Sequence, residues 1–175
     1  MLSRHSAFRK FRTAVFLDAL LSVRFDVAAA GSQKKAPAWK FQSVSGELVS
    51  LESFRGKVVV VSFGATWCPP CREELPALQE IADRYQGKGV QVLWVSVDER
   101  KVSDEQLRQF AAKFGLKVPV LRYPQTVAYA DVGDGSLPMQ VIIGRDGKFA
   151  GSPQIGFSNR SAFMSEVGGI IDRLL

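Results

Sequence analysis

The stretch VVVVSFGATWCPPCREELP, residues 58–76, decides the fold of this chain. Its first part, residues 58–63, is a run of mostly β-branched apolar side chains, which is typical of a strand covered on both faces. A helical pattern follows over residues 70–87 and keeps its apolar side chains on one face. Cys68 and Cys71, the only cysteines of the chain, therefore lie between a buried strand and the start of a helix.

The segments around this stretch continue the alternation of strands and helices. Pro76 is expected to kink the first helix near its second turn. The other predicted elements are two short strands around a turn at Ser45–Gly46, a strand at 90–98, a helix that starts at the capping box of residues 103–106, a short strand within 117–123, a helical turn at 126–133, a hairpin at 139–151 around Asp146–Gly147, and a helix at 158–175. Alternating strands and helices require parallel strands with right-handed crossovers, and the hairpin adds an antiparallel part. The sequence thus predicts an α/β fold with a central mixed sheet flanked by helices.

Composition excludes several classes of function. The apolar share of 46% and the charged share of 23% are those of an ordinary globular protein. The net charge is +6 but falls to +3 without residues 1–30, and the rest has no run of Lys or Arg, so a nucleic-acid partner is not expected. The only histidine is His5, so the domain can hold neither a Cys–His nucleophile pair nor a zinc ion bound by histidine. We expect no metal and no cofactor.

The N-terminal residues 1–30 resemble a degenerate export signal. They have a basic start and the small residues Ala28, Ala29 and Ala30, but charged side chains interrupt the apolar middle. A transit peptide and a segment with no targeting role remain the alternatives. Residues 31–37 are interpreted as a linker, and residues 38–175 as the folded domain.

The position of the cysteine pair predicts redox chemistry. A helix N-terminus favours a thiolate over a thiol, so Cys68 is expected to be the reactive and more exposed sulfur, and Cys71 the more buried one. The expected reaction is thiol–disulfide exchange, in which Cys68 attacks a partner disulfide and Cys71 then attacks Cys68 to release the reduced partner. Half of a zinc site shared between chains, two inert thiols and a purely structural disulfide are the alternatives.

Residues 38–175 resemble the thioredoxin superfamily, and within it the extracytoplasmic TlpA/ResA-like thiol–disulfide oxidoreductases. The resemblance rests on GELVSLESFRGK, GKVVVVSFGATWCPPCREELPAL, VSVDE and LPMQVIIGRDGK, in this order. It implies a thioredoxin-like fold and a reductase of protein disulfides in the periplasm or at a membrane, often in cytochrome c maturation. The implied partners are protein thiols or disulfides and an upstream electron donor such as a membrane thiol reductase.

The resemblance also implies roles for residues outside the cysteine pair. Pro138 would be a cis proline that faces the cysteines, and Leu137 before it would offer backbone groups to an extended substrate segment. Trp67 would contact the substrate, with packing against the sheet as its alternative. An oxidant or isomerase, and a binding or metal-handling module with little redox turnover, remain the rival functions.

Two positions depart from the family pattern. Minimal thioredoxins have a buried Asp where this chain has Ser62, so Glu74 is expected to take over proton transfer to Cys71; a solvated surface carboxylate is the alternative. Gly64 replaces the family's usual aromatic side chain and is expected to reshape the surface next to Cys68.

Overall fold

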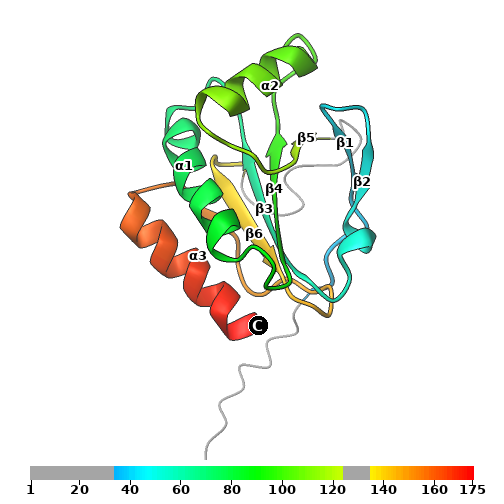
Figure 1. Cartoon of the computed structure of the whole chain (residues 1–175), viewed down its shortest axis with the longest axis vertical. Helices are drawn as coiled ribbons and strands as arrows, with labels where there is room; N and C mark the ends of the chain where they lie inside the picture. Colours follow the sequence, from blue (N-terminus) through cyan, green and yellow to red (C-terminus); the bar gives the residue numbers. More distant parts are fainter. Residues whose placement is uncertain (1–33, 124–134) are drawn as a thin grey trace, which may run out of the picture. The chain divides into compact units, whose positions relative to one another are not determined.

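The computed structural model describes residues 34–123 and 135–175, so the helical turn predicted at 126–133 lies outside the described residues. Figure 1 shows the arrangement of the elements. In chain order they are β1 (Lys40–Ser43), β2 (Leu48–Ser50), the 3-10 helix η1 (Leu51–Phe54), β3 (Val58–Gly64), α1 (Pro69–Arg84), β4 (Val90–Ser96), α2 (Asp104–Lys113), β5 (Val120–Arg122), β6 (Met139–Ile143), β7 (Gln154–Ile155) and α3 (Arg160–Leu174).

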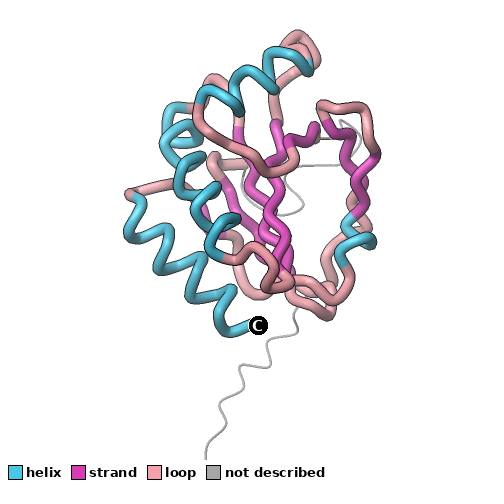
Figure 2. Tube along the Cα trace, in the orientation of Figure 1, coloured by secondary structure: helices cyan, strands magenta, loops and turns pink. Residues whose placement is uncertain are grey.

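The strands form one mixed sheet in the order β2-β1-β5-β4-β3-β6-β7. The central strands β3, β4 and β5 are parallel, and the outer pairs are antiparallel. Helices α1 and α2 provide the two crossovers between the parallel strands, as Figure 2 shows by its alternation of strand and helix along the trace. The predicted α/β architecture, a mixed sheet flanked by helices, is confirmed.

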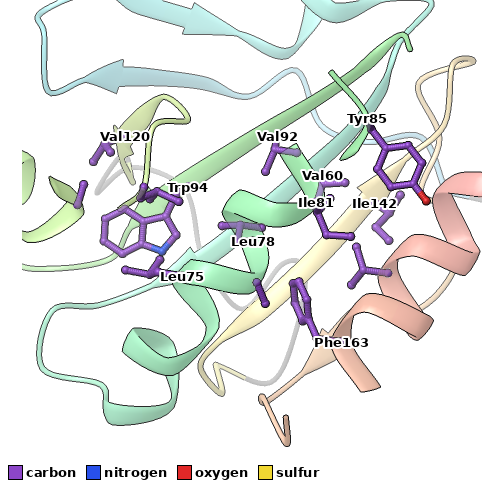
Figure 3. Close-up of a cluster of buried hydrophobic side chains, with 14 of the residues drawn as sticks. Val60, Leu75, Leu78, Ile81, Tyr85, Val92, Trp94, Val120, Ile142 and Phe163 are labelled. Atoms are coloured by element: carbon purple, nitrogen blue, oxygen red, sulfur yellow. The ribbon is translucent and has the colours of Figure 1, made fainter. Parts of the chain in front are cut away.

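Strand β3 is buried along its whole length because both faces of the sheet are covered. On one face the three helices pack on alternate residues of β3 and β4, and Figure 3 shows part of this cluster: Val60, Leu75, Leu78, Ile81, Val92, Trp94, Ile142 and Phe163. The other face carries a second apolar cluster built around Trp39, Phe41, Phe63, Leu93 and Val141. Side chains alternate between the faces of a strand, so every second residue of β3 faces α1.

Helix α1 starts at the cysteine pair. Cys68 is its N-cap residue, and Pro69 and Pro70 take the first two helical positions, where a missing N–H leaves no hydrogen bond unmade. The helix continues to Arg84 as one element with Pro76 inside it. Its C-terminal half packs against α3, where the Tyr85 hydroxyl donates a hydrogen bond to Asp172.

The hairpin predicted at 139–151 is confirmed around its turn, but its returning strand is interrupted and continues further, to residue 155. After the turn at Asp146–Gly147, Phe149 forms a bridge with Ile143, and the N–H of the next residue donates to the carbonyl of Ile142 at 2.8 Å. The strand β7 then pairs with the start of β6, Ile155 with Met139, while β3 pairs with the other edge of β6. Pro153, which has no N–H to give to a ladder, directly precedes β7, so the chain leaves the sheet before it pairs again.

Residues 34–36 contact the same turn. The N–H of Ala36 donates to the carbonyl of Gly147 at 3.0 Å, and the N–H of Phe149 donates to the carbonyl of Lys34 at 3.0 Å. These residues belong to the segment interpreted as a linker, and they add backbone pairing at the end of the sheet opposite the cysteines.

Candidate active site

The cysteine pair lies where β3 ends and α1 begins. Cys68 and Cys71 form a disulfide with their Cα atoms 5.3 Å apart. Cys68 is 4% exposed and Cys71 is completely buried, so the difference in exposure has the expected direction. The backbone N–H of Cys71 donates to the sulfur of Cys68 at 3.3 Å. An N–H at a helix start that points at Cys68 favours negative charge on this sulfur once the disulfide is reduced.

The loop before β6 meets the cysteines. The peptide bond between Leu137 and Pro138 is cis. Leu137 packs with Ala65, Cys68 and Cys71, which lie about 70 residues earlier in the chain. Pro138 is buried, and its carbonyl accepts a hydrogen bond from Gly156 at 2.8 Å. The fold thus brings Leu137, which the resemblance assigned to substrate binding, next to the cysteines, directly before the cis Pro138.

Trp67 directly precedes the disulfide and is exposed. Its side chain is 66% accessible, whereas most large apolar side chains of the domain are buried. The alternative that Trp67 packs against the sheet is therefore wrong. An exposed aromatic side chain beside a reactive sulfur offers apolar surface to a partner.

Glu74 is completely buried, so the alternative of a solvated surface carboxylate is wrong. Its Oε1 accepts hydrogen bonds from the hydroxyl of Ser62 at 2.8 Å and from the amide of Gln140 at 3.0 Å. Its Oε2 has no partner among the described residues. Burial raises the pKa of Glu74 to about 8, against the opposing effect of the two hydrogen bonds. Cys71 lies one helical turn before Glu74, so both occupy the same face of α1.

Sequence reasoning missed Gln140. It lies opposite Ser62 in the pairing of β6 with β3, so the two side chains share the face of the sheet that α1 covers. The available signal was a polar residue inside the apolar run MQVII, at a position predicted to be buried. The hydrogen bonds from Ser62 and Gln140 give the buried carboxyl group of Glu74 polar partners, which apolar residues at these two positions could not supply.

Gly64 does not shape the surface next to Cys68, contrary to expectation. It is the buried last residue of β3, and a Cβ atom there would lie 2.9 Å from Nε1 of Trp94 and 3.4 Å from Cβ of Cys71. The side chain of Trp94, from the neighbouring strand β4, takes this space and stacks on Phe110 of α2. The missing aromatic at position 64 is thus compensated inside the core.

Asp98 is the second site residue that sequence reasoning missed. Its carboxylate accepts hydrogen bonds from the Thr66 backbone N–H at 3.0 Å and from the Thr66 hydroxyl at 2.7 Å. It also accepts one from the Ser96 hydroxyl at 2.8 Å. The signal was positional, since Asp98 follows β4 at the edge of the sheet where β3 leads to the cysteines. These bonds fix the residue before Trp67.

Within residues 34–123 and 135–175, no cluster of three His, Cys, Asp or Glu side chains is arranged to hold a metal ion. In the same part of the chain, no helix has the length and apolar character needed to cross a membrane. The groups gathered at the site are two sulfurs, the buried carboxyl group of Glu74, the carboxylate of Asp98 and the exposed side chain of Trp67.

Known proteins are similar to this chain in sequence. The thiol-disulfide oxidoreductase ResA of Bacillus thuringiensis (strain Al Hakam) is 33% identical over 115 residues, which are 66% of this chain and 65% of that protein. ResA of Geobacillus kaustophilus is 31% identical over 145 residues, 78% of this chain and 82% of the relative. The first of these matches thus spans slightly less than two thirds of the relative's length.

A solved structure is similar to this chain in fold as well. The exposed lipoprotein thioredoxin Etrx1 of Streptococcus pneumoniae strain TIGR4 superposes with a TM-score of 0.61 and 28% identity, over 75% of this chain and 98% of that one. Residues 32–151 also match the AhpC/TSA family, and they include the cysteine pair, Glu74 and the cis proline. This protein is a member of the AhpC/TSA family, with a thioredoxin-like domain similar to ResA.

Proposed function

We propose that this protein is a thiol–disulfide oxidoreductase that reduces protein disulfides with the Cys68–Cys71 pair. One observation carries the proposal: the pair forms a disulfide at the start of α1, with the buried carboxyl group of Glu74 one turn further along the helix. Relatives of this chain bear the name thiol-disulfide oxidoreductase, which supports the same reaction.

The first half of the reaction uses Cys68. Its thiolate attacks one sulfur of the partner's disulfide, the partner's S–S bond breaks, and the second partner sulfur leaves as a thiolate. The N-terminus of α1 stabilises the attacking thiolate. The product is a mixed disulfide between Cys68 and the partner.

The second half uses Cys71 and Glu74. The carboxylate of Glu74 accepts the proton of the Cys71 thiol, and the Cys71 thiolate then attacks the sulfur of Cys68. The partner's remaining sulfur leaves as a thiolate, and Cys68 and Cys71 end as the disulfide seen here. An upstream thiol donor must return two electrons before the next cycle; we propose a membrane thiol reductase for this role.

The partner segment lies against Leu137, Pro138 and Trp67. We assign backbone pairing with an extended segment to Leu137, and apolar contact to the exposed side chain of Trp67. Pro138 has no N–H, so it places no competing hydrogen-bond donor next to the sulfurs.

We place this activity outside the cytoplasm, with cytochrome c maturation as the process. The support for the location is the basic start and small residues of segment 1–30, together with the similarity to a thioredoxin named as an exposed lipoprotein. The process is what the resemblance to the TlpA/ResA-like oxidoreductases implies. We further propose that residues 1–30 act as the export signal and residues 31–37 as the linker to the domain at 38–175.

Trapping of the mixed disulfide tests the function. In Cys71→Ser, expressed with its own N-terminus in its natural compartment, the second half of the reaction is blocked, so disulfide-linked complexes should accumulate on a non-reducing gel. Apocytochromes among the trapped partners would support the reductase direction and the proposed process.

The matched control carries both Cys68→Ser and Cys71→Ser and should trap nothing. If Cys71→Ser traps no more than this control, the oxidoreductase proposal fails. A binding module would show the opposite pattern, because Cys68→Ser alone would leave its function intact.

A further inference from the structure

A row of polar side chains crosses an otherwise apolar face of the sheet. Ser62 on β3 lies opposite Gln140 on β6, and Gln140 lies opposite Gln154 on the edge strand β7. Directly paired residues point to the same face, here the one that α1 and α3 cover. The neighbours along the strands, Val60 and Ile142, are apolar and belong to the core in Figure 3. The row thus leads from the buried carboxyl group of Glu74 to the edge of the sheet.

A pocket of about 160 Å³ lies at the outer end of this row. Gln140 both lines the pocket and donates its amide N–H to Glu74. Ile155, Ser158 and Glu166, which also line it, are exposed, so the pocket reaches the surface. Its volume is enough for several water molecules, and Gln140 and Gln154 supply polar groups that water needs.

The hydrogen bonds of Glu74 identify the atom that carries the proton. Oε1 already accepts two bonds, from Ser62 and Gln140, whereas Oε2 has no partner among the described residues. The O–H of the neutral acid therefore sits on Oε2, which needs an acceptor such as water to lose its proton. A completely buried acid cannot exchange its proton with bulk solvent unless water reaches it.

We propose that the pocket beside Gln140 is the proton outlet of Glu74: water enters between β7 and α3, passes Gln140 and takes up the proton held on Oε2. Gln140 and Gln154 are positioning residues for this water. The inference rests on the proposed function, in which Glu74 must release the proton of Cys71 after each cycle. In the outlet step the O–H bond of the acid breaks, and the proton leaves on water as hydronium.

Few charges face this path. Burial alone raises the pKa of Glu74, the bonds from Ser62 and Gln140 lower it, and no charged side chain is among the causes of the shift. Glu166, on α3, is the one charged group that lines the described part of the pocket. Its carboxylate lies at the exposed mouth, where it favours a departing cation.

Proton exchange of Glu74 tests the outlet in the oxidised protein, where neither cysteine titrates. The carboxyl carbon of ¹³C-labelled Glu74 is followed by NMR between pH 6 and 10 in wild type, Gln154→Leu and the control Gln86→Leu, which alters an exposed glutamine elsewhere. We expect one averaged resonance that titrates in wild type and control. Gln154→Leu should keep the midpoint, because it does not touch Glu74, but should broaden or split the resonance as exchange slows. Gln154→Asn should restore the averaged signal.

Unchanged exchange in Gln154→Leu, with a normal titration of Glu74, would overturn the outlet and leave the proposed function standing. If Glu74 does not titrate at all in wild type, both its role as proton acceptor and the outlet fall. If Gln154→Leu does not fold, Ser158→Leu obstructs the exposed mouth instead and should slow the exchange in the same way.

Discussion

Two carboxyl groups flank the cysteine pair, and their surroundings differ sharply. Asp98 accepts hydrogen bonds with both oxygens, from Thr66 and Ser96, and remains partly accessible to solvent. Glu74 is completely buried, and one of its oxygens has no partner among the described residues. A saturated carboxylate holds a loop in place, whereas a buried carboxyl group with a free oxygen is prepared to exchange a proton.

The contrast assigns a structural role to Asp98 and a chemical role to Glu74. Asp98 orders Thr66, and through it the exposed Trp67 and the approach to Cys68. Glu74 lies one helical turn after Cys71, where its carboxyl group can take part in the chemistry. Loss of Asp98 should therefore change how partners meet the protein, and loss of Glu74 should change how the reaction depends on pH.

The largest expected effect concerns the pH dependence of stability. Burial raises the pKa of Glu74 to about 8, so between the ordinary carboxyl range and pH 8 the folded protein holds a proton that the unfolded chain has lost. The free energy of unfolding should consequently fall as pH rises through this window, by several kcal/mol in total. Glu74→Gln, which mimics the neutral acid, should abolish that fall and be more stable than wild type above pH 8.

Urea unfolding at a series of pH values measures this effect. Asp98→Asn is the matched control and should keep the wild-type fall in stability. Parallel curves for wild type and Glu74→Gln would mean that Glu74 is not a buried acid with a raised pKa, and the contrast between the two carboxyl groups would disappear.

The next effect concerns the tight packing beside Cys71. In Gly64→Ala the new Cβ would lie 2.9 Å from the indole nitrogen of Trp94, so the core must shift at a cost of about 1–3 kcal/mol. Gly169→Ala, in α3, serves as control because its Cβ meets nothing closer than 3.7 Å and alanine favours the helix. Denaturant midpoints should fall for the first variant and rise for the second; equal midpoints would contradict the close packing of Trp94 on Gly64.

The smallest expected effect is that of Asp98→Asn on stability. The variant replaces one acceptor oxygen with an NH2 group that donates instead of accepting, so a bond from Thr66 or Ser96 is lost, at a cost of about 1 kcal/mol at this partly exposed position. Reduction of a protein disulfide should slow through a weaker encounter with the partner, seen as a higher KM in an insulin reduction assay. A lower kcat at unchanged KM would instead give Asp98 a part in the chemistry.

Local sequence patterns predicted the elements around the cysteines well, because the residues that specify each of these elements lie within the element itself. The β-branched run specifies β3, and the capping box at Ser103 specifies the start of α2, without contacts to distant residues. The turn and the start of the returning strand were predicted correctly, but its interruption before Pro153 and its continuation as β7 were not, because local patterns do not show how far the pairing with β6 extends.

Spacing along the chain predicted the cysteine pair, and the family resemblance predicted the cis bond before Pro138, but the surroundings of these groups were not predictable. The cysteines, and Glu74 one turn later, follow from helix geometry, but burial of Glu74 depends on β6 bringing Gln140 opposite Ser62. The position of Trp94 beside Gly64 likewise requires the parallel pairing of β3 with β4. Contacts between strands far apart in sequence decide the surroundings of each group. The register of these strands cannot be predicted from the local patterns of a single sequence.

Single-turnover kinetics of the second half of the reaction test the central claim most directly. The mixed disulfide of Cys68 with a labelled peptide is formed by rapid mixing, and release of the peptide by Cys71 is followed from pH 6 to 10. In wild type the rate should rise with pH and level off near the pKa of Glu74, because only the carboxylate accepts the proton. In Glu74→Gln it should fall by about a hundredfold at pH 8 and lose this plateau, whereas Asp98→Asn should keep the wild-type profile. A Glu74→Gln profile identical to that of wild type would contradict the account.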